Sequence, residues 1–328
     1  MSPDRFEQLT GRYPSLRLAV VGDFCLDRYL EIDPARAEIS IETGLPVHNI
    51  TRIRSQPGAA GTILANLAAL GIGTIYAIGF CGDDGEGYEL HRALNTLPGV
   101  DASQFFTSTD RSTFTYTKPL ICAPDAVPVE LSRLDVKNWT HTPASLSRSL
   151  AEAVRFVAPD VDAIIVMDQV SEADTGAITP AVRRALAELG AEKPVRPIVA
   201  DSRRSLREFT NVIWKMNAAE LSALGGGDVG SLAERNGRPV FVTQAERGMI
   251  CATPDGATFH VPSHPVRGPI DIVGAGDSVT ANLTAALAAL AAPPEAMELA
   301  MAAASVVIHQ LGTTGTARVE DLRAFAAA

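Results

Sequence analysis

The chain has 328 residues, of which 46% are hydrophobic and 20% charged, and its formal net charge is −10. This balance is typical of a globular protein with a large core and excludes an intrinsically disordered chain. The negative charge disfavours nucleic acids and anionic membranes as partners, because both are themselves negatively charged. An acidic protein still binds small anions where backbone N–H groups form a local pocket.

The four cysteines are far apart in the sequence and form no CxxC pair, so no structural zinc site is expected. Free thiols in a reducing cytoplasm are the simplest interpretation. The first fifteen residues, MSPDRFEQLTGRYPS, lack the apolar core of a secretion signal. The apolar stretch 279–309 is interrupted by Pro293, Pro294 and Glu295, which predicts two buried helices and no transmembrane span.

Short apolar runs alternate with helical patterns along most of the chain. The expected strands cover residues 16–22, 74–80, 162–167, 197–200, 212–216, 239–243 and 249–252. The expected helices cover residues 58–70, 143–157, 175–189 and 217–224. This alternation predicts an α/β fold with a doubly wound, mostly parallel sheet flanked by helices.

Two segments break the alternation, at about 29–54 and 113–134. Both contain β-type residues and turn formers but no helical period. We expect them to form a small second β-sheet, called the lid below, because such flaps commonly cover the active sites of α/β enzymes. Ordinary long connections are the alternative. Residues 1–328 are expected to form a single domain that includes the lid.

The segment DIVGAGD, residues 271–277, has the strongest chemical signal. Gly274 and Gly276 permit a tight turn close to a ligand, and the alanine-rich run that follows predicts a helix. The turn therefore lies at a helix N-terminus, where free N–H groups favour an anion. Asp277 is either a helix N-cap or a general base beside that anion. The glycines do not form a GxGxxG dinucleotide turn, since residue 279 is Val, and no GK[ST] follows them.

DIVGAGD resembles the DTxGAGD signature of the ribokinase-like (PfkB) carbohydrate kinase family, and other segments agree with that family in order. They are VVGDFCLD at 20–27, PGAA at 57–60, NAAE at 217–220, VTQAERG at 242–248 and HQLGTTG at 309–315. The similarity extends from about residue 16 to residue 322. Within the family, the VVGDFCLDRY start, RLD at 133–135 and the late LGT resemble the heptose-phosphate kinase branch.

The resemblance implies transfer of the γ-phosphoryl group of ATP to a hydroxyl of a sugar or sugar phosphate, including heptose-phosphate-like sugars. Asp277 would be the general base, and the backbone of Gly274, Ala275 and Gly276 would stabilise the transferred group. The implied substrate-binding residues are Asp27, Gly58, Ala59, Thr62, Arg133 and Asp168. The implied nucleotide-binding residues are Asn217, Glu220, Thr243, Gly248, Met301 and Gly312.

The implied cofactors are ATP and Mg²⁺, with Glu220 acting on Mg²⁺ through water, and a potassium-type cation beside Asp271. Asn217 and Glu220 also match a helix capping box, and the two interpretations are compatible. Asp201 resembles the Asp that the family carries before its phosphate region. Relatives often dimerise through the lid, and exposed sheet edges are commonly covered by a partner chain, so a homodimer is expected.

Several positions depart from the family pattern. Ala59 replaces the second Gly of the substrate motif, and Thr62 stands where an Asn holds sugar hydroxyls. Ser171 replaces a Lys of the heptose branch, Met301 an Asn near the adenine, and Gln244 an Arg. The sugar pocket is therefore expected to differ from that of the branch. A non-catalytic sugar- or nucleotide-binding paralogue and a kinase of a nucleoside-like alcohol are the alternatives.

Overall fold

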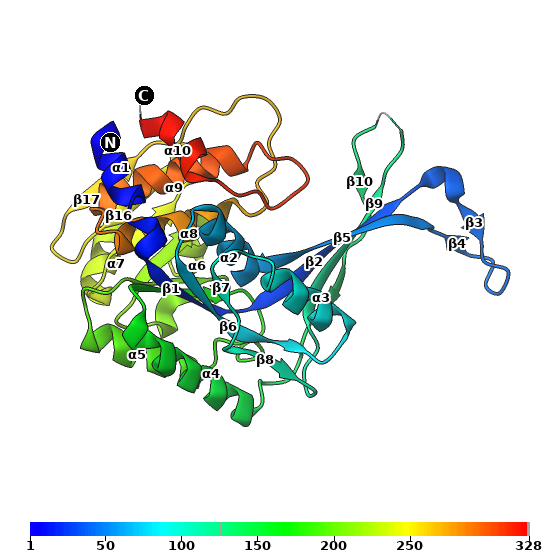
Figure 1. The fold of residues 1–328 in the computed structure, drawn as a ribbon, viewed down its shortest axis with the longest axis horizontal. Helices are drawn as coiled ribbons and strands as arrows, with labels where there is room; N and C mark the ends of the chain where they lie inside the picture. Colours follow the sequence, from blue (N-terminus) through cyan, green and yellow to red (C-terminus); the bar gives the residue numbers. More distant parts are fainter. Residues whose placement is uncertain (125, 327–328) are drawn as a thin grey trace.

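The computed structural model describes residues 1–124 and 126–326. Its main sheet has ten strands in the order β17-β16-β15-β14-β13-β12-β1-β6-β7, with β8 paired to β6 (Figure 1). The strands are β17 Thr258–Val261, β16 Met249–Ala252, β15 Val240–Thr243, β14 Ile213–Asn217, β13 Ile198–Ser202, β12 Ala163–Asp168, β1 Arg17–Gly22, β6 Thr74–Gly82, β7 Val100–Asp101 and β8 Phe105–Ser108. Only the pairs β15–β16 and β16–β17 are antiparallel. The predicted α/β class with a mostly parallel sheet is confirmed.

Helices cover both faces of the main sheet, and its central strands are buried as a result. On one face lie α2 Ala60–Ala69, α8 Ala275–Ala288 and α9 Pro293–Val307, and on the other α4 Ala144–Val157 and α5 Pro180–Glu192 (Figure 1). The remaining helices are α1 Pro3–Thr10, α3 Gly85–Leu94, α6 Ala218–Ala223, α7 Val229–Asn236 and α10 Val319–Ala326. In β1, Leu18 to Val21 are fully buried, as expected for a parallel strand covered on both sides.

The second sheet projects from the main body and forms the lid (Figure 1). Its strands are β2 Phe24–Ile32, β5 Ile50–Ala59, β9 Phe114–Ile121, β10 Val129–Glu130 and β11 Leu134–Val136. The order is β10-β9-β2-β5, with β11 also paired to β9. A short ribbon of β3 Glu38–Ile39 and β4 Pro46–Val47 lies between β2 and β5 in sequence. The predicted second sheet is present, although it begins at Phe24 and reaches Val136.

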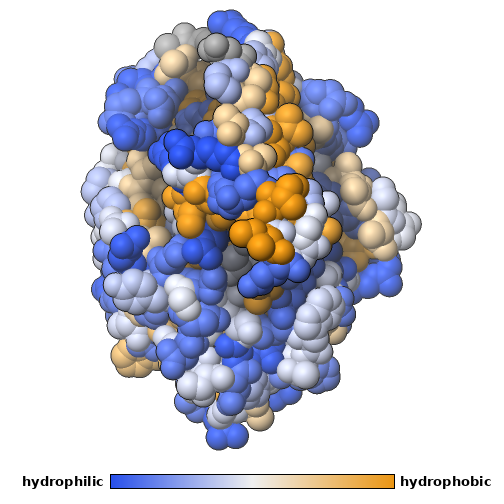
Figure 2. Space-filling view, turned by 90° about the vertical axis from the view of Figure 1, so that its right-hand side faces the viewer, coloured by the Kyte–Doolittle hydropathy of each residue, from blue (hydrophilic) through white to orange (hydrophobic). Residues whose placement is uncertain are grey.

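Apolar side chains gather on the face that the lid presents in Figure 2. The exposed large apolar residues of the lid, here called the lid patch, are Ile39, Ile41, Leu45, Ile50, Ile53, Val127, Val129, Leu134 and Val136. Isolated exposed apolar residues are ordinary, but a group of this size is typical of an interaction surface.

Two predicted helices begin later in the structure than in the sequence prediction. Gly58 and Ala59 extend β5, and α2 begins only at Ala60 because Ala59 turns the chain with φ of 52°. Helix α5 begins at Pro180, where the Thr179 hydroxyl accepts the Val182 N–H, so residues 175–179 form a loop. The two buried helices predicted within 279–309 are confirmed as α8 and α9. Among the described residues, no helix is both long and apolar enough to span a bilayer.

Asp84 joins helix α3 to the segment that enters the lid. As the N-cap of α3 it accepts the Gly87 N–H at 2.7 Å. It also accepts the Thr113 N–H at 2.9 Å and the Thr113 hydroxyl at 2.6 Å, one residue before β9. One carboxylate thus holds two elements that are distant in sequence.

We predict that Asp84→Ala lowers the free energy of unfolding by about 2–4 kcal/mol, because a helix cap is lost and buried donors of Thr113 lose their acceptor. Urea denaturation measures the change. Asp110→Ala removes an equally charged but exposed side chain nearby, and should change stability by less than about 0.5 kcal/mol. Equal effects of the two substitutions would contradict the assigned role of Asp84.

Candidate active site

Polar side chains collect where the parallel strands of the main sheet end. Asp168 ends β12, Asp201 lies one residue before the end of β13, Asn217 ends β14 and Thr243 ends β15. The strand register places Asp201 beside Lys215 of β14, and Asn217 beside Thr243. This carboxyl edge is where open α/β sheets bind ligands.

A cavity of about 400 Å³ lies between this edge and the lid. It is lined by seven of the predicted site residues, namely Asp27, Ala59, Thr62, Arg133, Gly274, Gly276 and Asp277. They come from lid strands, from the turn between β10 and β11, from α2 and from the start of α8, so the fold brings together residues that are far apart in sequence. Gly58, Ala275 and Asp168 are not among the residues that line it.

Asp277 is the third residue of α8 and faces this cavity. The N-cap position belongs to Gly274, so the N-cap interpretation of Asp277 is wrong. Within residues 1–124 and 126–326, no hydrogen bond to its carboxylate is found. Burial raises the pKa of Asp277 to about 7, and the charge of Asp201 adds to this, whereas Lys215 and Arg203 act in the opposite direction. A carboxyl group with a pKa near 7 suits a general base at neutral pH.

The glycine turn before Asp277 has free donors. Gly274 has φ of 81°, and a Cβ there would lie 3.0 Å from the Cβ of Thr314. Both the backbone conformation and the lack of space therefore favour glycine at this position. The Ala275 N–H donates to the Ile272 carbonyl at 3.2 Å. In the described part of the chain, the N–H groups of Gly274 and Gly276 have no such acceptor. Two N–H groups are therefore available for an anion at this helix end.

Lys215 of β14, which no sequence motif indicated, contacts the backbone of the glycine turn. Its ammonium group is buried and lies 2.7 Å from Asp201 Oδ2 and 3.4 Å from the carbonyl oxygen of Gly276. The Thr280 hydroxyl donates to the same Asp201 oxygen at 3.0 Å. Burial alone would lower the pKa of Lys215, but the charge and hydrogen bond of Asp201 raise it, so the lysine stays protonated. The available signal was a lysine inside an apolar run predicted to be a buried strand.

Asp27 supplies a carboxylate from the lid side of the cavity. It lies on β2 opposite Gln56 of β5 and Tyr116 of β9. Burial raises its pKa, while the charges of Lys118 and Arg133 lower it. A Cβ at Gly58 would lie only 2.6 Å from Asp27 Oδ2, so this glycine leaves the room that the carboxylate occupies.

Three cations, Lys118, Arg133 and Lys137, line the lid side of the same cavity. Arg133 donates to both oxygens of Asp135, at 2.7 and 2.8 Å, and its guanidinium lies 5.0 Å from the ring centre of Tyr116. These contacts fix the orientation of Arg133 beside the cavity. The lid side of the cavity therefore carries three cations beside the carboxylate of Asp27.

Asp168 does not line the cavity, although the next residue, Gln169, does. Asp168 is buried and accepts the Ser202 hydroxyl at 2.6 Å. Burial and the nearby charge of Asp23 raise the pKa of Asp168 to about 7. Its position supports the loop 169–179, whose residues Gln169, Val170, Ser171, Glu172 and Thr175 do line the cavity.

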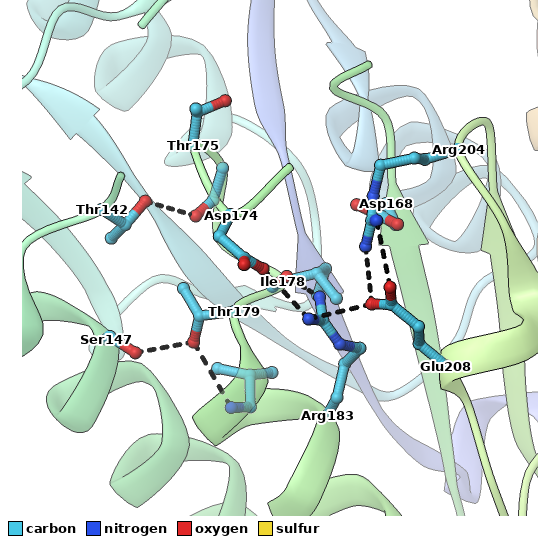
Figure 3. Close-up of polar contacts among 12 residues, drawn as sticks. Thr142, Ser147, Asp168, Asp174, Thr175, Ile178, Thr179, Arg183, Arg204 and Glu208 are labelled. Atoms are coloured by element: carbon cyan, nitrogen blue, oxygen red, sulfur yellow. Dashed lines mark hydrogen bonds and ion pairs between the residues drawn. The ribbon is translucent and has the colours of Figure 1, made fainter. Parts of the chain in front are cut away.

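Ion pairs hold the far side of this loop, as Figure 3 shows. Arg183 lies 3.0 Å from Asp174 and 2.9 Å from Glu208. Arg204 lies 2.8 Å from the same Glu208 oxygen. The network joins α5, the loop 169–179 and the segment after β13, so it restrains two walls of the site.

Glu220 lines a second cavity of about 250 Å³, and Arg203 lines both cavities. The Glu220 carboxylate accepts the Asn217 N–H at 2.7 Å, and Asn217 Oδ1 accepts the Glu220 N–H at 2.9 Å. The predicted capping box is confirmed. Burial raises the pKa of Glu220, and the charge of Asp201 contributes. The two cavities are neighbours joined at Arg203.

Asp271 links two loops beside the glycine turn. Its oxygens accept the Val273 N–H at 3.0 Å and the Gly312 N–H at 3.1 Å. The next residues of the second loop touch the lid, where Gln56 Nε2 donates to the Thr314 hydroxyl at 2.8 Å. The lid and the glycine turn are thus connected through one loop.

Thr243, Gly248 and Met301 line neither of these two cavities. The Thr243 hydroxyl donates to the Met216 carbonyl at 3.4 Å, and Met301 is buried in α9. Gly248 has φ of 90°, and a Cβ there would lie 2.1 Å from the Val261 carbonyl oxygen. The structure therefore groups the predicted substrate residues more closely than the predicted nucleotide residues.

Glu220 can take part in holding Mg²⁺ only together with other ligands. In the described residues, no group of three His, Cys, Asp or Glu side chains is placed to hold a metal ion. Mg²⁺ usually keeps several waters and is bound by one or two carboxylates with substrate phosphates. The half-buried Glu220 beside the cavities fits that kind of water-mediated contact.

Comparisons with known proteins identify the family of the chain. The family described as "pfkB family carbohydrate kinase" matches residues 17–319. Bifunctional protein HldE from Gluconobacter oxydans is 30% identical over 316 residues, which cover 93% of this chain and 63% of that protein. The chain thus spans less than two thirds of the length of this curated relative.

Solved structures show the same fold at low sequence identity. Ribokinase of Arabidopsis thaliana complexed with ribose and ATP has a TM-score of 0.69 and 18% identity, and covers 95% of this chain and 99% of its own. A putative ribokinase II from E. coli in complex with ATP and Mg²⁺ has a TM-score of 0.69 and 17% identity, with coverages of 95% and 99%. The ribokinase-like fold, a large mostly parallel sheet with a small lid sheet, is confirmed.

Proposed function

The chain belongs to the pfkB family of carbohydrate kinases, and we propose from this membership that it transfers the γ-phosphoryl group of ATP to a hydroxyl of a sugar or sugar phosphate. The single observation that most supports the proposal is the placement of Asp277. Its carboxyl group, with a pKa near 7, lies at the first turn of α8 and faces a cavity shared with Asp27. A base, an anion-binding helix end and a sugar-sized cavity therefore coincide.

In the proposed reaction, Asp277 accepts the proton of the substrate hydroxyl as the hydroxyl oxygen bonds to the γ-phosphorus. The bond from that phosphorus to the oxygen bridging to the β-phosphate breaks, and its electron pair leaves with ADP. The free N–H groups of Gly274 and Gly276 stabilise charge on the transferred group. Lys215 keeps the Gly276 carbonyl in place, so these donors are oriented before the substrate binds.

Mg²⁺, when bound, neutralises phosphate charge, and Glu220 would hold it through water together with the phosphates of ATP. The two similar ribokinase structures, one complexed with ribose and ATP and the other with ATP and Mg²⁺, support the same choice of cofactors. The role of Glu220 in the capping box is compatible with this, because only one carboxylate oxygen accepts the Asn217 N–H.

The cavity supports a sugar substrate that carries an anionic group. Asp27 and the Thr62 hydroxyl would bind sugar hydroxyls, since both residues line the same cavity as Asp277. Lys118, Arg133 and Lys137 would bind a phosphate on the substrate. Heptose-phosphate-like sugars fit this description, and Thr62 offers fewer hydrogen bonds than the Asn of the family motif.

We predict that Asp277→Asn lowers kcat about 10²- to 10⁴-fold, because Asn cannot accept the hydroxyl proton. ADP formation over a panel of sugars, sugar phosphates and nucleosides measures this and identifies the substrate class. Thermal shifts with an ATP analogue show whether the variant still binds ligands. If both proteins bind sugars but are equally inert with every acceptor, the chain is a binding protein and the kinase proposal is wrong.

The pH profile of the wild type tests the same role of Asp277. Only the deprotonated carboxylate accepts a proton, so kcat/KM should fall about tenfold per pH unit below a pH of about 7. Analogue binding measured at the same pH values separates this loss from loss of affinity. A rate that is independent of pH down to about pH 5 would exclude Asp277 as a base with a raised pKa.

We infer that the lid patch is covered by a second copy of the chain, as the family resemblance implies. Ile53→Glu on β5 should convert the dimer to a monomer, because it buries a charge in an apolar interface. Light scattering measures the mass. Val195→Glu alters an exposed apolar residue outside the lid and should leave the dimer intact. A wild type that is monomeric at high concentration would contradict the inference.

A potassium-type cation beside Asp271 is also proposed. The Asp271 carboxylate lies between two loops and offers oxygen ligands, which such cations prefer. We expect a higher kcat in KCl than in NaCl of equal ionic strength, and expect Asp271→Asn to remove the difference. Equal rates of the wild type in both salts would show that no such site operates.

A further inference from the structure

Arg203 occupies a position that the kinase motifs do not explain. It follows β13 directly and lies in the linings of both the cavity of Asp277 and the cavity of Glu220. Under the proposed function, these are the sides from which the hydroxyl group and the Mg²⁺-bound phosphates approach. A residue shared by the two linings lies where the phosphoryl group passes.

The backbone at Arg203 is held in place. Its N–H donates to the Asp168 carbonyl at 3.0 Å. The preceding Ser202 hydroxyl accepts the N–H groups of Arg204 at 3.2 Å and Ser205 at 3.1 Å. Hydrogen bonds therefore fix the main chain after β13, and the side chain of Arg203 is the part of this residue that can bind a ligand.

The neighbouring arginines of this segment are already engaged. Arg204 donates to both oxygens of Glu208, at 3.2 and 2.8 Å, and Arg207 donates to the Leu224 carbonyl. Arg203, in contrast, is exposed, and across the residues that the structure describes its guanidinium has no hydrogen-bond or ion-pair partner. Such a guanidinium is available to bind an anion.

The positive charge of Arg203 acts on carboxyl groups in both cavities. It lowers the pKa of Asp277, of Asp27 and of Glu220, in each case against the larger effect of burial. Arg203 lines one cavity together with Asp27 and Asp277 and the other cavity together with Glu220, so it lies close to all three carboxyl groups. An anion bound between the two cavities would give the guanidinium the partner that it lacks among the described residues.

We propose that Arg203 is a catalytic residue that binds the phosphoryl group during its transfer. The inference rests on the proposed kinase function and adds a residue to it. In phosphoryl transfer, negative charge spreads over three equatorial oxygens, and a guanidinium can donate to two of them at once. Gly274 and Gly276 would donate from the helix end, and Arg203 would donate from the carboxyl end of β13.

The test compares Arg203→Ala and Arg203→Lys with the wild type. We expect Arg203→Ala to lower kcat about 10²- to 10³-fold, with a much smaller change in the KM of the sugar. Arg203→Lys keeps the charge but loses the planar fork, so its kcat should lie between the other two. Millimolar guanidinium added to Arg203→Ala should restore part of the rate, which loss of structure would not allow. Arg184→Ala removes an exposed arginine from α5 and should leave kcat within about twofold.

Two results would overturn the inference about Arg203. One is a kcat of Arg203→Ala within about threefold of the wild type. The other is a loss that appears in KM alone or is accompanied by a lowered Tm in both Arg203 variants. The proposed kinase function fails separately, through a wild type that is inert with every acceptor. An active wild type with an unaffected Arg203→Ala would remove the role of Arg203 and leave the kinase in place.

Discussion

The buried ion pair between Lys215 and Asp201 determines where the site can form. It joins β13 to the middle of β14 at 2.7 Å, and the same ammonium lies 3.4 Å from the Gly276 carbonyl at the start of α8. A buried pair of this kind adds little net stability, because desolvation offsets the attraction. Losing one partner, however, leaves an unpaired buried charge. The pair therefore fixes the position of the glycine turn relative to the sheet more than it strengthens the fold.

The lid is attached to the main body at a second fixed point, Asp23, which lies between β1 and β2. Its buried carboxylate accepts the N–H groups of Gln169, Val170 and Ala177 at 2.8, 3.1 and 2.7 Å. A Cβ at Gly176 would lie 2.2 Å from the same carboxylate, so only glycine fits there. The root of the lid and the loop 169–179 are thus held together. Both walls of the cavity depend on carboxylates that do not themselves face it.

The fold could be predicted from the sequence largely because buried parallel strands appear as short apolar runs. The predicted ends of helices and strands were wrong where local backbone geometry decides them. The positive φ of Ala59 ends β5 and starts α2, and the Thr179 cap sets the start of α5. Helix α3 was missed, since its sequence GEGYELHRAL has two glycines and only a short apolar period. Its N-cap, Asp84, was the signal that remained.

In the candidate site, too, some residues could be predicted from the sequence and others could not. Motifs predicted Asp27, Thr62 and Asp277, and the fold brings these three to one cavity. Asp168 was implied by the resemblance to the heptose branch, but it does not line the cavity, because its carboxylate accepts the Ser202 hydroxyl and successive side chains of a strand point to opposite faces. Lys215 and Arg203 belong to no motif that was recognised. Lys215 lies beside Asp201 because of the register of β13 and β14, and Arg203 lines two cavities that only the folded chain forms. A single sequence shows neither of these relations.

The contact between Gln56 and Thr314 has a thermodynamic consequence. Gln56 lies opposite Asp27 in the lid sheet, and the loop of Thr314 is bonded through Gly312 to Asp271 beside the glycine turn. A sugar that orders the lid would also order this loop, so a nucleotide arriving second would lose less conformational entropy on binding. Linkage makes the effect mutual, and each ligand would then tighten the binding of the other by the same factor.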